Sequence, residues 1–327
     1  MLGRRTAILG VGATGAFFGA TYLRAVVPSV APKPRTQLDF LVPKGACDSH
    51  VHVIGVPQKF PMSPERDSTP PPATVGELSQ VLGFLHLDRV VIVTPTLYGD
   101  DNSATTDAVT VLGRDRARGI ALISEAFSPA ALAALKSAGI VGFRAFLDQG
   151  DYFDPRLQTK RLQARFDLAE HLGWHLDISA PPEIVAAVKE PLAASPVPLV
   201  FDYFGWAAGG VEQPGFDAVL SLVQSGRAYV KLSEPYRLSA RGPNYPNLAQ
   251  VAKALVSANA DRVLWGSGWP HVSGGVPGQK KTDLAPDLPI DAGHLLNLFA
   301  EWVPDAETRH KILVDNPARL YGFQAQV

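Results

Sequence analysis

The 327-residue sequence predicts an α/β fold in which eight parallel strands close into a single (β/α)8 barrel. Eight short runs rich in apolar and β-branched residues alternate with longer segments of helical period, which is the pattern of repeated βα units. The alternation ends close to the carboxyl terminus, and no glycine-rich phosphate loop follows the first run. Both features favour a closed barrel over an open, doubly wound sheet.

The expected elements follow one another along the chain from about residue 44. The apolar runs place strands at residues 47–54, 89–94, 119–124, 142–147, 174–179, 199–204, 228–233 and 262–266. The segments of helical period place helices at 74–85, 103–114, 129–138, 156–172, 182–194, 216–224 and 247–259. Two further helices, at 291–302 and 306–314, are expected to complete the ring.

The composition limits the classes of function. Hydrophobic residues make up 46% of the chain and charged residues 19%, which is enough apolar material for one large core. The formal net charge is −1, and basic residues form no run beyond the extreme amino terminus, which argues against a nucleic-acid surface. Cys47 is the single cysteine, which excludes an internal disulfide and a cysteine-based zinc knuckle. We therefore expect a small-molecule partner.

The amino terminus predicts export. Arg4 and Arg5 precede an apolar stretch from residue 7 to about 22, which resembles a twin-arginine signal. That stretch is shorter than the roughly 20 residues needed to span a bilayer, although an uncleaved anchor stays an alternative because Pro32 follows the small-residue site that ends at Ala31. We expect residues 1–31 to be this signal or anchor, 32–43 a linker and 44–327 the barrel, in a periplasmic or exported protein.

The carboxyl ends of barrel strands carry the active site in this fold, so polar residues there are the site candidates. His50 and His52 are two residues apart on the first strand and therefore share a face, which suits a metal or a substrate anion if that face is inward. The structural alternative is a pair of half-buried histidines satisfied by the backbone. The remaining candidates at strand ends are Asp48, Tyr98, Asn102, Arg144, Asp177, Ser179, Asp202, Tyr203, Glu234, Arg237, Trp269 and His271.

Several motifs make the sequence resemble one family. They are Cys47-Asp48-Ser49-His50-Val51-His52-Val53, Phe60-Pro61-Met62-Ser63-Pro64, Tyr98-Gly99-Asp100-Asp101-Asn102, Gly142-Phe143-Arg144, Trp265-Gly266-Ser267-Gly268-Trp269-Pro270-His271 and the closing Asp315-Asn316-Pro317-Ala318-Arg319-Leu320-Tyr321. Together they resemble the amidohydrolase-related TIM barrels, in the branch of 2-pyrone-4,6-dicarboxylate lactonase and galactarolactone isomerase. The resemblance runs from about residue 43 to 321.

The resemblance implies chemistry on a lactone or a related carbonyl compound. In that setting His50 and His52 polarise the substrate carbonyl, while Arg144 and Arg237 match the family's arginine positions and bind substrate carboxylates through their guanidinium forks. The loop from Tyr98 to Asn102, together with Asp202 and Trp269, would contribute to substrate binding. For that loop, a polar turn that caps the following helix is an equally good interpretation.

Two positions depart from the family pattern. Tyr203 stands where the family has a histidine after strand 6, and Gly268 stands where it has the aspartate that acts as general base on strand 8. Catalytic zinc usually has three protein ligands, and only His50 and His52 can be identified, because His175 lies toward the wrong end of strand 5. We therefore expect no tightly bound metal, with zinc or another divalent ion binding weakly at most.

The lost aspartate leaves the general base open, because glycine cannot deprotonate water. Glu234 follows strand 7 and could point over the barrel mouth, or it could simply pair with Arg237. His271 could act as base, or it could fix the strand 8 loop. Further candidates are Asp177, Asp202 and Tyr203; on a regular strand only one of the last two would face inward.

Three functions remain open on the sequence alone. The first is an exported hydrolase of a carboxylated lactone or related cyclic ester that uses His50, His52 and His271. The second is a lactone isomerase or lyase acting on a sugar or aromatic acid, for which Tyr203 could serve as the acid. The third is a barrel that has lost catalysis and binds a small acid.

Overall fold

A computed structural model describes residues 31–124, 126–147, 154–275 and 277–324 of the chain. The predicted export signal therefore lies outside the described residues, apart from Ala31. No helix within the described ranges is both long enough and apolar enough to cross a membrane.

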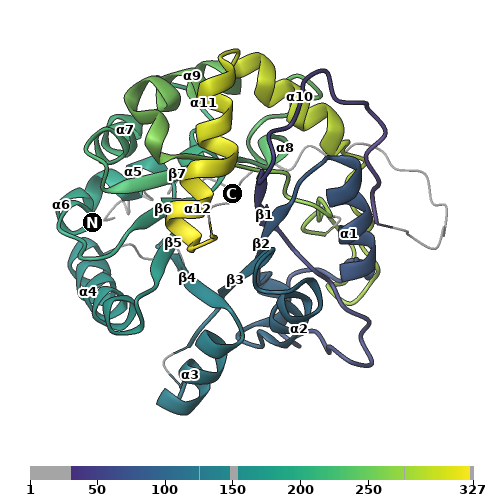
Figure 1. The fold of residues 1–327 in the computed structure, drawn as a ribbon. Helices are drawn as coiled ribbons and strands as arrows, with labels where there is room; N and C mark the ends of the chain where they lie inside the picture. The colour runs from purple at the N-terminus through teal and green to yellow at the C-terminus, as the bar shows by residue number, and fades with distance from the viewer. Residues whose placement is uncertain (1–30, 125, 148–153, 276, 325–327) are drawn as a thin grey trace, which may run out of the picture.

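Eight parallel strands form one sheet in the sequential order β1 to β8, which confirms the predicted barrel (Figure 1). Their bounds are β1 Cys47–Val51, β2 Arg89–Val93, β3 Ala117–Ala121, β4 Ile140–Phe146, β5 His175–Ser179, β6 Leu199–Phe201, β7 Ala228–Ser233 and β8 Val263–Gly266. The sheet closes where the amide of Gly268 donates to the carbonyl of His50 at 2.8 Å. Asp48 Oδ1 adds to this seam by accepting from the amides of His50 and Ser267 at 3.1 and 2.9 Å.

The helices surround the strands and cover the outside of the barrel (Figure 1). They are α1 Val75–Phe84, α2 Ser103–Leu112, α3 Pro129–Ser137, α4 Pro155–Leu172, α5 Pro182–Ala187, α6 Lys189–Ala193, α7 Phe216–Gln224, α8 Pro235–Leu238, α9 Pro246–Asn259, α10 Ala292–Trp302, α11 Ala306–His310 and α12 Asn316–Tyr321. Local signals fix their starts. Thr74 forms a capping box with Glu77 before α1, and Asp291 accepts from the amides of Gly293 and His294 at the start of α10.

Two expected elements differ in the structure. The single helix expected at 182–194 is broken at Val188 into α5 and α6, because Pro191 has no N–H to donate to the carbonyl four residues earlier and its ring crowds that carbonyl. Strand β6 ends at Phe201, three residues earlier than expected, and Tyr203 and Phe204 turn away with φ of 53° and 54°. The strict in–out alternation expected for Asp202 and Tyr203 is therefore wrong.

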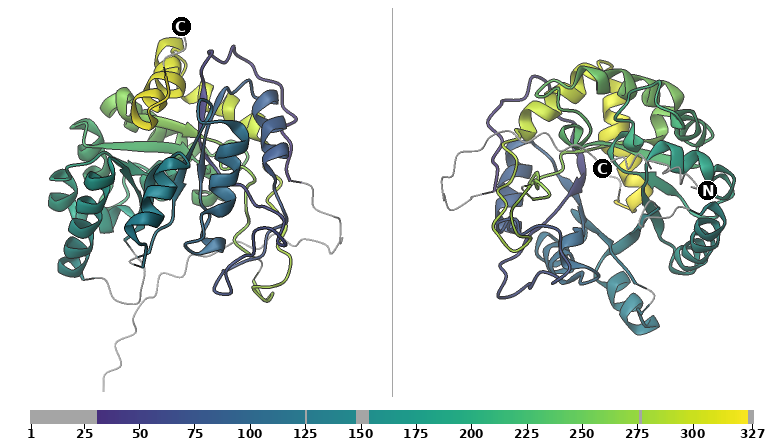
Figure 2. Two further views of the ribbon diagram at one scale, coloured as in Figure 1. Left: turned by 60° about the horizontal axis from the view of Figure 1, so that its bottom comes forward. Right: turned by 180° about the vertical axis from the view of Figure 1, so that it is seen from behind.

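The two ends of the barrel are built differently (Figure 2). Helix α12 crosses the amino-terminal end, where Arg118 Nε donates to the carbonyl of Tyr321 at 3.0 Å and the ring of His175 lies 5.4 Å from that of Tyr321. His175 is thus at the end remote from the mouth, as the sequence suggested. Long loops after β1 and β8 lie at the opposite end and are joined by Thr69, whose hydroxyl donates to the carbonyl of Lys281 at 2.7 Å.

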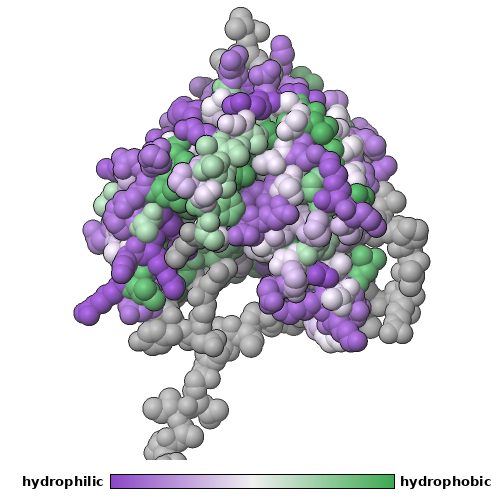
Figure 3. Space-filling model, turned by 90° about the horizontal axis from the view of Figure 1, so that it is seen from below, coloured by the Kyte–Doolittle hydropathy of each residue, from purple (hydrophilic) through white to green (hydrophobic). Residues whose placement is uncertain are grey.

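Helix α3 is the least embedded part of the ring. Figure 3 views the molecule from below Figure 1, which is the side on which α3 lies. Only Leu132 of this helix is buried, whereas Ala130, Ala133 and Ala134 are exposed. The core of the protein therefore lies between the strands and the other helices, and α3 contributes little to the mouth.

Candidate active site

The first-strand histidines lie at the carboxyl end of the barrel, and both are buried. His52 Nδ1 is 2.7 Å from the carbonyl oxygen of Val93. Because a carbonyl can only accept, Nδ1 carries the hydrogen and Nε2 keeps its lone pair. Burial, followed by the nearby His50, lowers the pKa of His52 to about 3, so this ring is neutral at physiological pH.

His50 lies between two carboxylates. Its Nδ1 is 3.3 Å from Asp202 Oδ1, and its Nε2 is 3.4 Å from Glu234 Oε1. Neither ring nitrogen makes a well-directed hydrogen bond to a protein group, although the ring is fully buried. The two histidines contact each other edge to face, with ring centroids 5.2 Å apart.

The carboxylate of Glu234 occupies the space that the residue at 268 would fill if it had a side chain. A Cβ built on Gly268 would lie 2.1 Å from Glu234 Cγ and 2.5 Å from the Tyr236 hydroxyl. Glu234 reaches this position from β7 because its backbone is left-handed, with φ of 51°. A carboxylate thus lies against Gly268 at the end of β8, but it belongs to Glu234, which follows the neighbouring strand β7.

Arg237 fixes this carboxylate through one oxygen. Its Nε and Nη2 both lie 2.8 Å from Glu234 Oε2, whereas Oε1 has no hydrogen-bond partner. Burial raises the pKa of Glu234, but the charge of Arg237 together with His50 and His52 more than offsets this and the pKa is lowered overall. Glu234 is therefore an anion with one free oxygen that faces His50.

A second guanidinium reaches the mouth from β4. Arg144 Nη2 is 3.5 Å from Asp202 Oδ2 and 3.3 Å from the Tyr203 hydroxyl, and Nη1 is 3.4 Å from the carbonyl of Thr94. These contacts are long, and Arg144 Nε has no partner. Arg237 lies over the Tyr203 ring, 5.1 Å from its centroid. The two guanidinium groups therefore flank Tyr203, and Arg144 in particular has unused donors.

A buried ion-pair layer lies directly beneath the mouth, formed by Lys231, Asp177 and Asp202. Lys231 Nζ is 2.5 Å from Asp177 Oδ2 and 3.1 Å from Asp202 Oδ1. Burial raises the pKa of Asp202, but Lys231, His50 and Arg144 outweigh it and hold that pKa well below its usual range. The sequence analysis did not select Lys231, although a lysine within the apolar strand Ala228–Ser233 was a signal that could have been used.

His271 is held by a short hydrogen-bonded chain. The Tyr236 hydroxyl donates to the carbonyl of Gly268 at 3.1 Å, and His271 Nδ1 is 3.2 Å from that hydroxyl. Because the hydroxyl hydrogen is already used, Nδ1 must be the donor and Nε2 keeps its lone pair. Nε2 is buried without a partner, and burial lowers the pKa of His271 to about 4, so the ring is neutral.

Three expected substrate-binding residues have protein partners instead. The Tyr98 hydroxyl accepts from the amide of Gly55 at 2.9 Å, and Trp269 Nε1 donates to the carbonyl of Pro32 at 2.9 Å. Asn102 Oδ1 accepts from Thr94 and Leu122, and its Nδ2 donates to two carbonyls. The cap of α2 comes from Asp101, which accepts from the Ser103 amide, and not from Asn102. These side chains tether loops, and their expected role in substrate binding stays a prediction.

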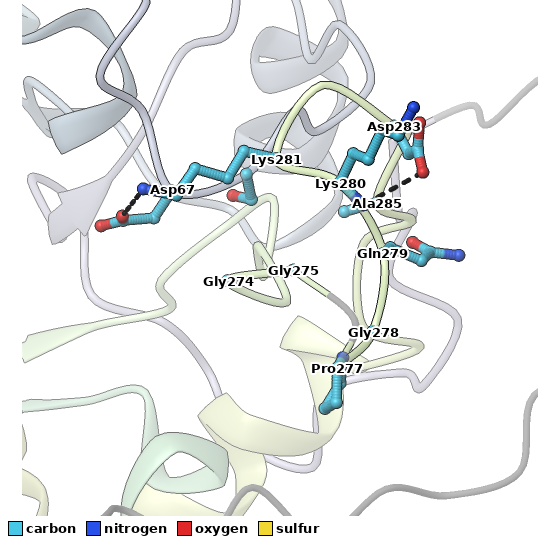
Figure 4. A pocket seen from close by; sticks show the side chains of 11 residues that line it. Asp67, Gly274, Gly275, Pro277, Gly278, Gln279, Lys280, Lys281, Asp283 and Ala285 are labelled. Atoms are coloured by element: carbon cyan, nitrogen blue, oxygen red, sulfur yellow. Dashed lines mark hydrogen bonds and ion pairs between the residues drawn. The ribbon is translucent and has the colours of Figure 1, made fainter.

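A hollow of about 300 Å³ lies beside the mouth in the loop after β8 (Figure 4). Its lysines are occupied at least in part, since Lys281 Nζ is 3.4 Å from Asp67 Oδ1. The described residues that line it include no histidine and no buried carboxylate. It lacks the buried acceptors that surround His50, so the mouth is the better candidate for the active site.

Comparison with known proteins identifies the family of the chain. A family model described as amidohydrolase matches residues 47–323. The 4-sulfomuconolactone hydrolase of Rhizobium radiobacter is 34% identical over 300 residues, which are 91% of this chain and 97% of that protein. The 2-pyrone-4,6-dicarboxylate hydrolase of Comamonas testosteroni is 33% identical, over 86% of this chain and 92% of that protein.

A solved structure gives the same result. The probable 2-pyrone-4,6-dicarboxylic acid hydrolase of Acinetobacter baumannii, crystallised with citric acid bound, superposes with a TM-score of 0.70 at 26% identity. The match covers 85% of this chain and all of that one. The barrel and the arrangement of its strands are thus shared with that protein.

Proposed function

The chain belongs to the amidohydrolase family, and from that premise we propose that it is a hydrolase of a lactone carrying at least one further acidic group. The relatives described above are named for lactones that bear a sulfonate or two carboxylates. The mouth of this barrel offers two guanidinium groups, two buried histidines and a third histidine with a free lone pair. These groups suit an anionic cyclic ester.

The guanidinium groups bind the acidic substituents of the substrate. Arg144 is held only by contacts of 3.3 to 3.5 Å and has a free Nε, so a substrate anion can replace its weak contact with Asp202. The side chain of Arg237 is 28% exposed even though it pairs with Glu234. Guanidinium groups bind carboxylates and sulfonates through paired N–H donors. Such pairing fixes the orientation of the lactone ring.

The free Nε2 of His271 is the observation that carries the proposal. A general base for water must be unprotonated and must have an available lone pair. Glu234 is paired with Arg237, whereas Asp177 and Asp202 are paired with Lys231. Although burial raises the pKa of each of these carboxyls, its cation outweighs burial and the pKa is lowered. His271 is neutral and its Nε2 has no hydrogen-bond partner, while its Nδ1 is oriented by Tyr236, so this ring has the free lone pair that a general base needs.

The reaction is the addition of water to the lactone carbonyl, followed by opening of the ring. His271 Nε2 takes a proton from water, the water oxygen bonds to the lactone carbonyl carbon, and the ring C–O bond breaks. The proton passes to the departing ring oxygen, which leaves a hydroxy acid that ionises. Tyr203, whose pKa is raised by burial and by Glu234, keeps its proton and donates a hydrogen bond to the bound substrate.

The lactone carbonyl has to be polarised by a hydrogen-bond donor or by a cation. His52 Nε2 and Glu234 Oε1 are hydrogen-bond acceptors, as is the carbonyl oxygen, so they cannot polarise it by themselves.

The test is turnover of lactones that carry carboxylate or sulfonate groups, followed by a pH indicator and by identification of the product. The full chain should open the ring and release acid, and His271→Gln should lower kcat by about 10²- to 10⁴-fold with little change in KM. A rearranged lactone without acid release would assign an isomerase instead. Thermal stabilisation by the same acids without any product would assign a binding protein.

We also propose that the protein is exported through the twin-arginine route. The support is the sequence alone, in Arg4, Arg5 and the apolar stretch that follows. Replacing both arginines by lysine should retain the protein in the cytoplasm, as measured by cell fractionation. Equal export of the two forms would contradict the proposal.

A further inference from the structure

Two arginines at the amino-terminal end of the barrel, remote from the mouth, lie against the same aromatic ring. Arg89 is the first residue of β2, and Arg118 lies on β3. Their guanidinium carbons are 5.3 and 4.6 Å from the centroid of the Phe323 ring, which follows α12 in the chain (Figure 1). We refer to Arg89 and Arg118 as the rear arginine pair.

The guanidinium group of Arg89 is buried but only partly satisfied. The residue is 2% exposed, and its Nη2 donates to the carbonyl of Gln324 at 2.5 Å. Its Nε and Nη1 are buried without a hydrogen-bond partner. No ion pair within the described residues includes either member of the rear arginine pair. Because an arginine keeps its charge in a protein, these buried donors need an acceptor.

The neighbours of the pair do not neutralise it. The hydrogen bonds of Arg118 all go to backbone carbonyls, which carry no net charge. Burial, followed by the charge of Arg114 and with a smaller contribution from Arg89, lowers the pKa of Arg118, and Asp115 offsets only part of this effect. Burial also raises the pKa of the adjacent Cys47 thiol far above its usual range, so this group is neutral.

The two chain segments that carry the pair concentrate positive charge at this corner of the barrel. Residues 88–89 and 114–118 together contain four arginines and two aspartates, which leaves an excess of two positive charges. Of the aspartates, Asp88 uses Oδ2 to accept from the amide of Gly45 at 2.6 Å, and Asp115 is exposed to solvent. Like charges held close together in a partly buried site are stabilised by an anion that lies between them.

We propose that the rear arginine pair binds one small oxyanion, which is a carboxylate, phosphate or sulfate group, at the amino-terminal end of the barrel. Guanidinium N–H donors form short, charge-assisted hydrogen bonds with such oxygens. Nε and Nη1 of Arg89 are the free donors. Arg118 is only half-buried and Gln324 is exposed, so solvent reaches the edge of the pair. A charged acceptor there would replace the neutral carbonyl of Gln324 as the partner of Arg89.

This site is separate from the arginines that bind acidic groups at the mouth. Arg144 lies on β4 toward its carboxyl end and Arg237 follows β7, whereas the rear arginine pair lies at the amino ends of β2 and β3. The inference therefore does not rest on the proposed lactone chemistry. An anion at the rear would neutralise the pair and stabilise the segment after α12 against the barrel, so it should raise the stability of the fold.

The test is calorimetric titration of the full chain with inorganic phosphate, sulfate or acetate in the absence of any lactone. The affinity order of the three ions separates a tetrahedral oxyanion from a carboxylate as the preferred ligand. The Tm should rise with the concentration of the ion that binds. Arg89→Gln should weaken binding by about 10- to 100-fold, because the ion loses buried, charged donors. Arg118→Gln should weaken it in the same direction.

Matched controls locate the ion. Arg161→Gln removes an exposed arginine of α4 and should leave affinity unchanged, and Arg144→Met should retain binding at the rear. In NMR spectra of the arginine Nε–H groups, the ion should shift the signal of Arg89, which is assigned by its loss in Arg89→Lys. Circular dichroism identifies any variant that unfolds, and in that case the Arg89 signal of the wild-type chain still decides.

The outcomes distinguish this inference from the proposed function. Equal affinities of Arg89→Gln and the wild-type chain, or no binding of any of the three ions, would overturn the rear site. So would an Arg89 signal that stays in place while Arg144→Met abolishes binding, because the ion would then lie at the mouth. Binding at the rear without lactone turnover would support this inference and contradict the lactone proposal.

Discussion

His50, His52 and Glu234, which we call the mouth cluster, and the ion-pair layer directly beneath them are both polar and buried, but their side chains are satisfied to different degrees. In the layer, Lys231 Nζ approaches two carboxylate oxygens at 2.5 and 3.1 Å. In the mouth cluster, His50 lies 3.3 and 3.4 Å from carboxylates, and several acceptor atoms have no partner. The charges of the layer are paired within the protein, with Asp177 Oδ1 left only a 3.2 Å contact to His175 Nε2, whereas the mouth leaves Glu234 Oε1 and His271 Nε2 without a hydrogen-bond partner.

This difference separates two roles that look alike in a sequence. A buried charge is tolerated when the protein itself pairs it, and then its removal affects folding. A buried polar atom without a partner is tolerated where a ligand or ion completes it, and then its removal affects function. The free energy of unfolding should therefore report on the layer, while ligand affinity and turnover should report on the mouth.

The largest effect on stability is expected for Lys231→Met. The change leaves Asp177 and Asp202 buried without their common cation, which should lower the free energy of unfolding by about 3–5 kcal/mol. Denaturant titration followed by circular dichroism measures this. Lys59→Met is the matched control, because Lys59 pairs with Asp107 at 2.7 Å on the surface and its loss should cost about 1 kcal/mol or less. Equal losses from the two changes would remove the distinction.

Arg144→Met tests the opposite expectation at the mouth. Its contacts with Asp202, Tyr203 and Thr94 are long, and Asp202 keeps Lys231 as a partner, so the unfolding free energy should fall by less than it does for Lys231→Met. The value of kcat/KM for an acidic lactone should fall by roughly 100-fold, mostly through KM, because the substrate anion loses a paired donor. A large loss of stability with unchanged KM would show that Arg144 belongs to the structural layer.

The fold was predictable because its signals are local. Each of the eight strands lies within a few residues of its expected place, since apolar runs and helical periods depend on neighbours in the chain. The errors occurred where one residue overrides a pattern. Pro191 breaks the helix expected at 182–194, and the left-handed backbone at Tyr203 ends β6 early.

The site was predictable only in part, because its geometry depends on contacts between distant segments. The strand-end rule selected both histidines, His271 and the arginines. The position of Glu234 depends on its own positive φ and on the empty space over Gly268, 34 residues later, which no local pattern encodes. Lys231 was accessible to reasoning, because a lysine on a barrel strand requires buried acids as partners.

The smallest effect concerns a carboxyl group outside both regions. Asp287 lies in the loop after β8, and neither of its oxygens has a hydrogen-bond partner. Burial, with a contribution from Glu77, raises the pKa of Asp287 to about 7, the opposite of the lowered pKa of Asp202. Because the folded state holds this proton more tightly than the unfolded chain, Asp287 reduces stability progressively as pH rises from about 4 to 7.

Asp287→Asn removes that proton dependence and keeps the size of the side chain. The variant should match the parent near pH 4 and exceed its unfolding free energy by about 1–2 kcal/mol at pH 8, a value reduced for the partial exposure of the group. Thermal unfolding of both proteins across this pH range measures the difference. A difference of constant size, or one that grows toward acid pH, would contradict the raised pKa. Turnover of an acidic lactone should not change, because neither carboxylate oxygen of Asp287 forms a hydrogen bond to the described residues of the mouth or of the ion-pair layer.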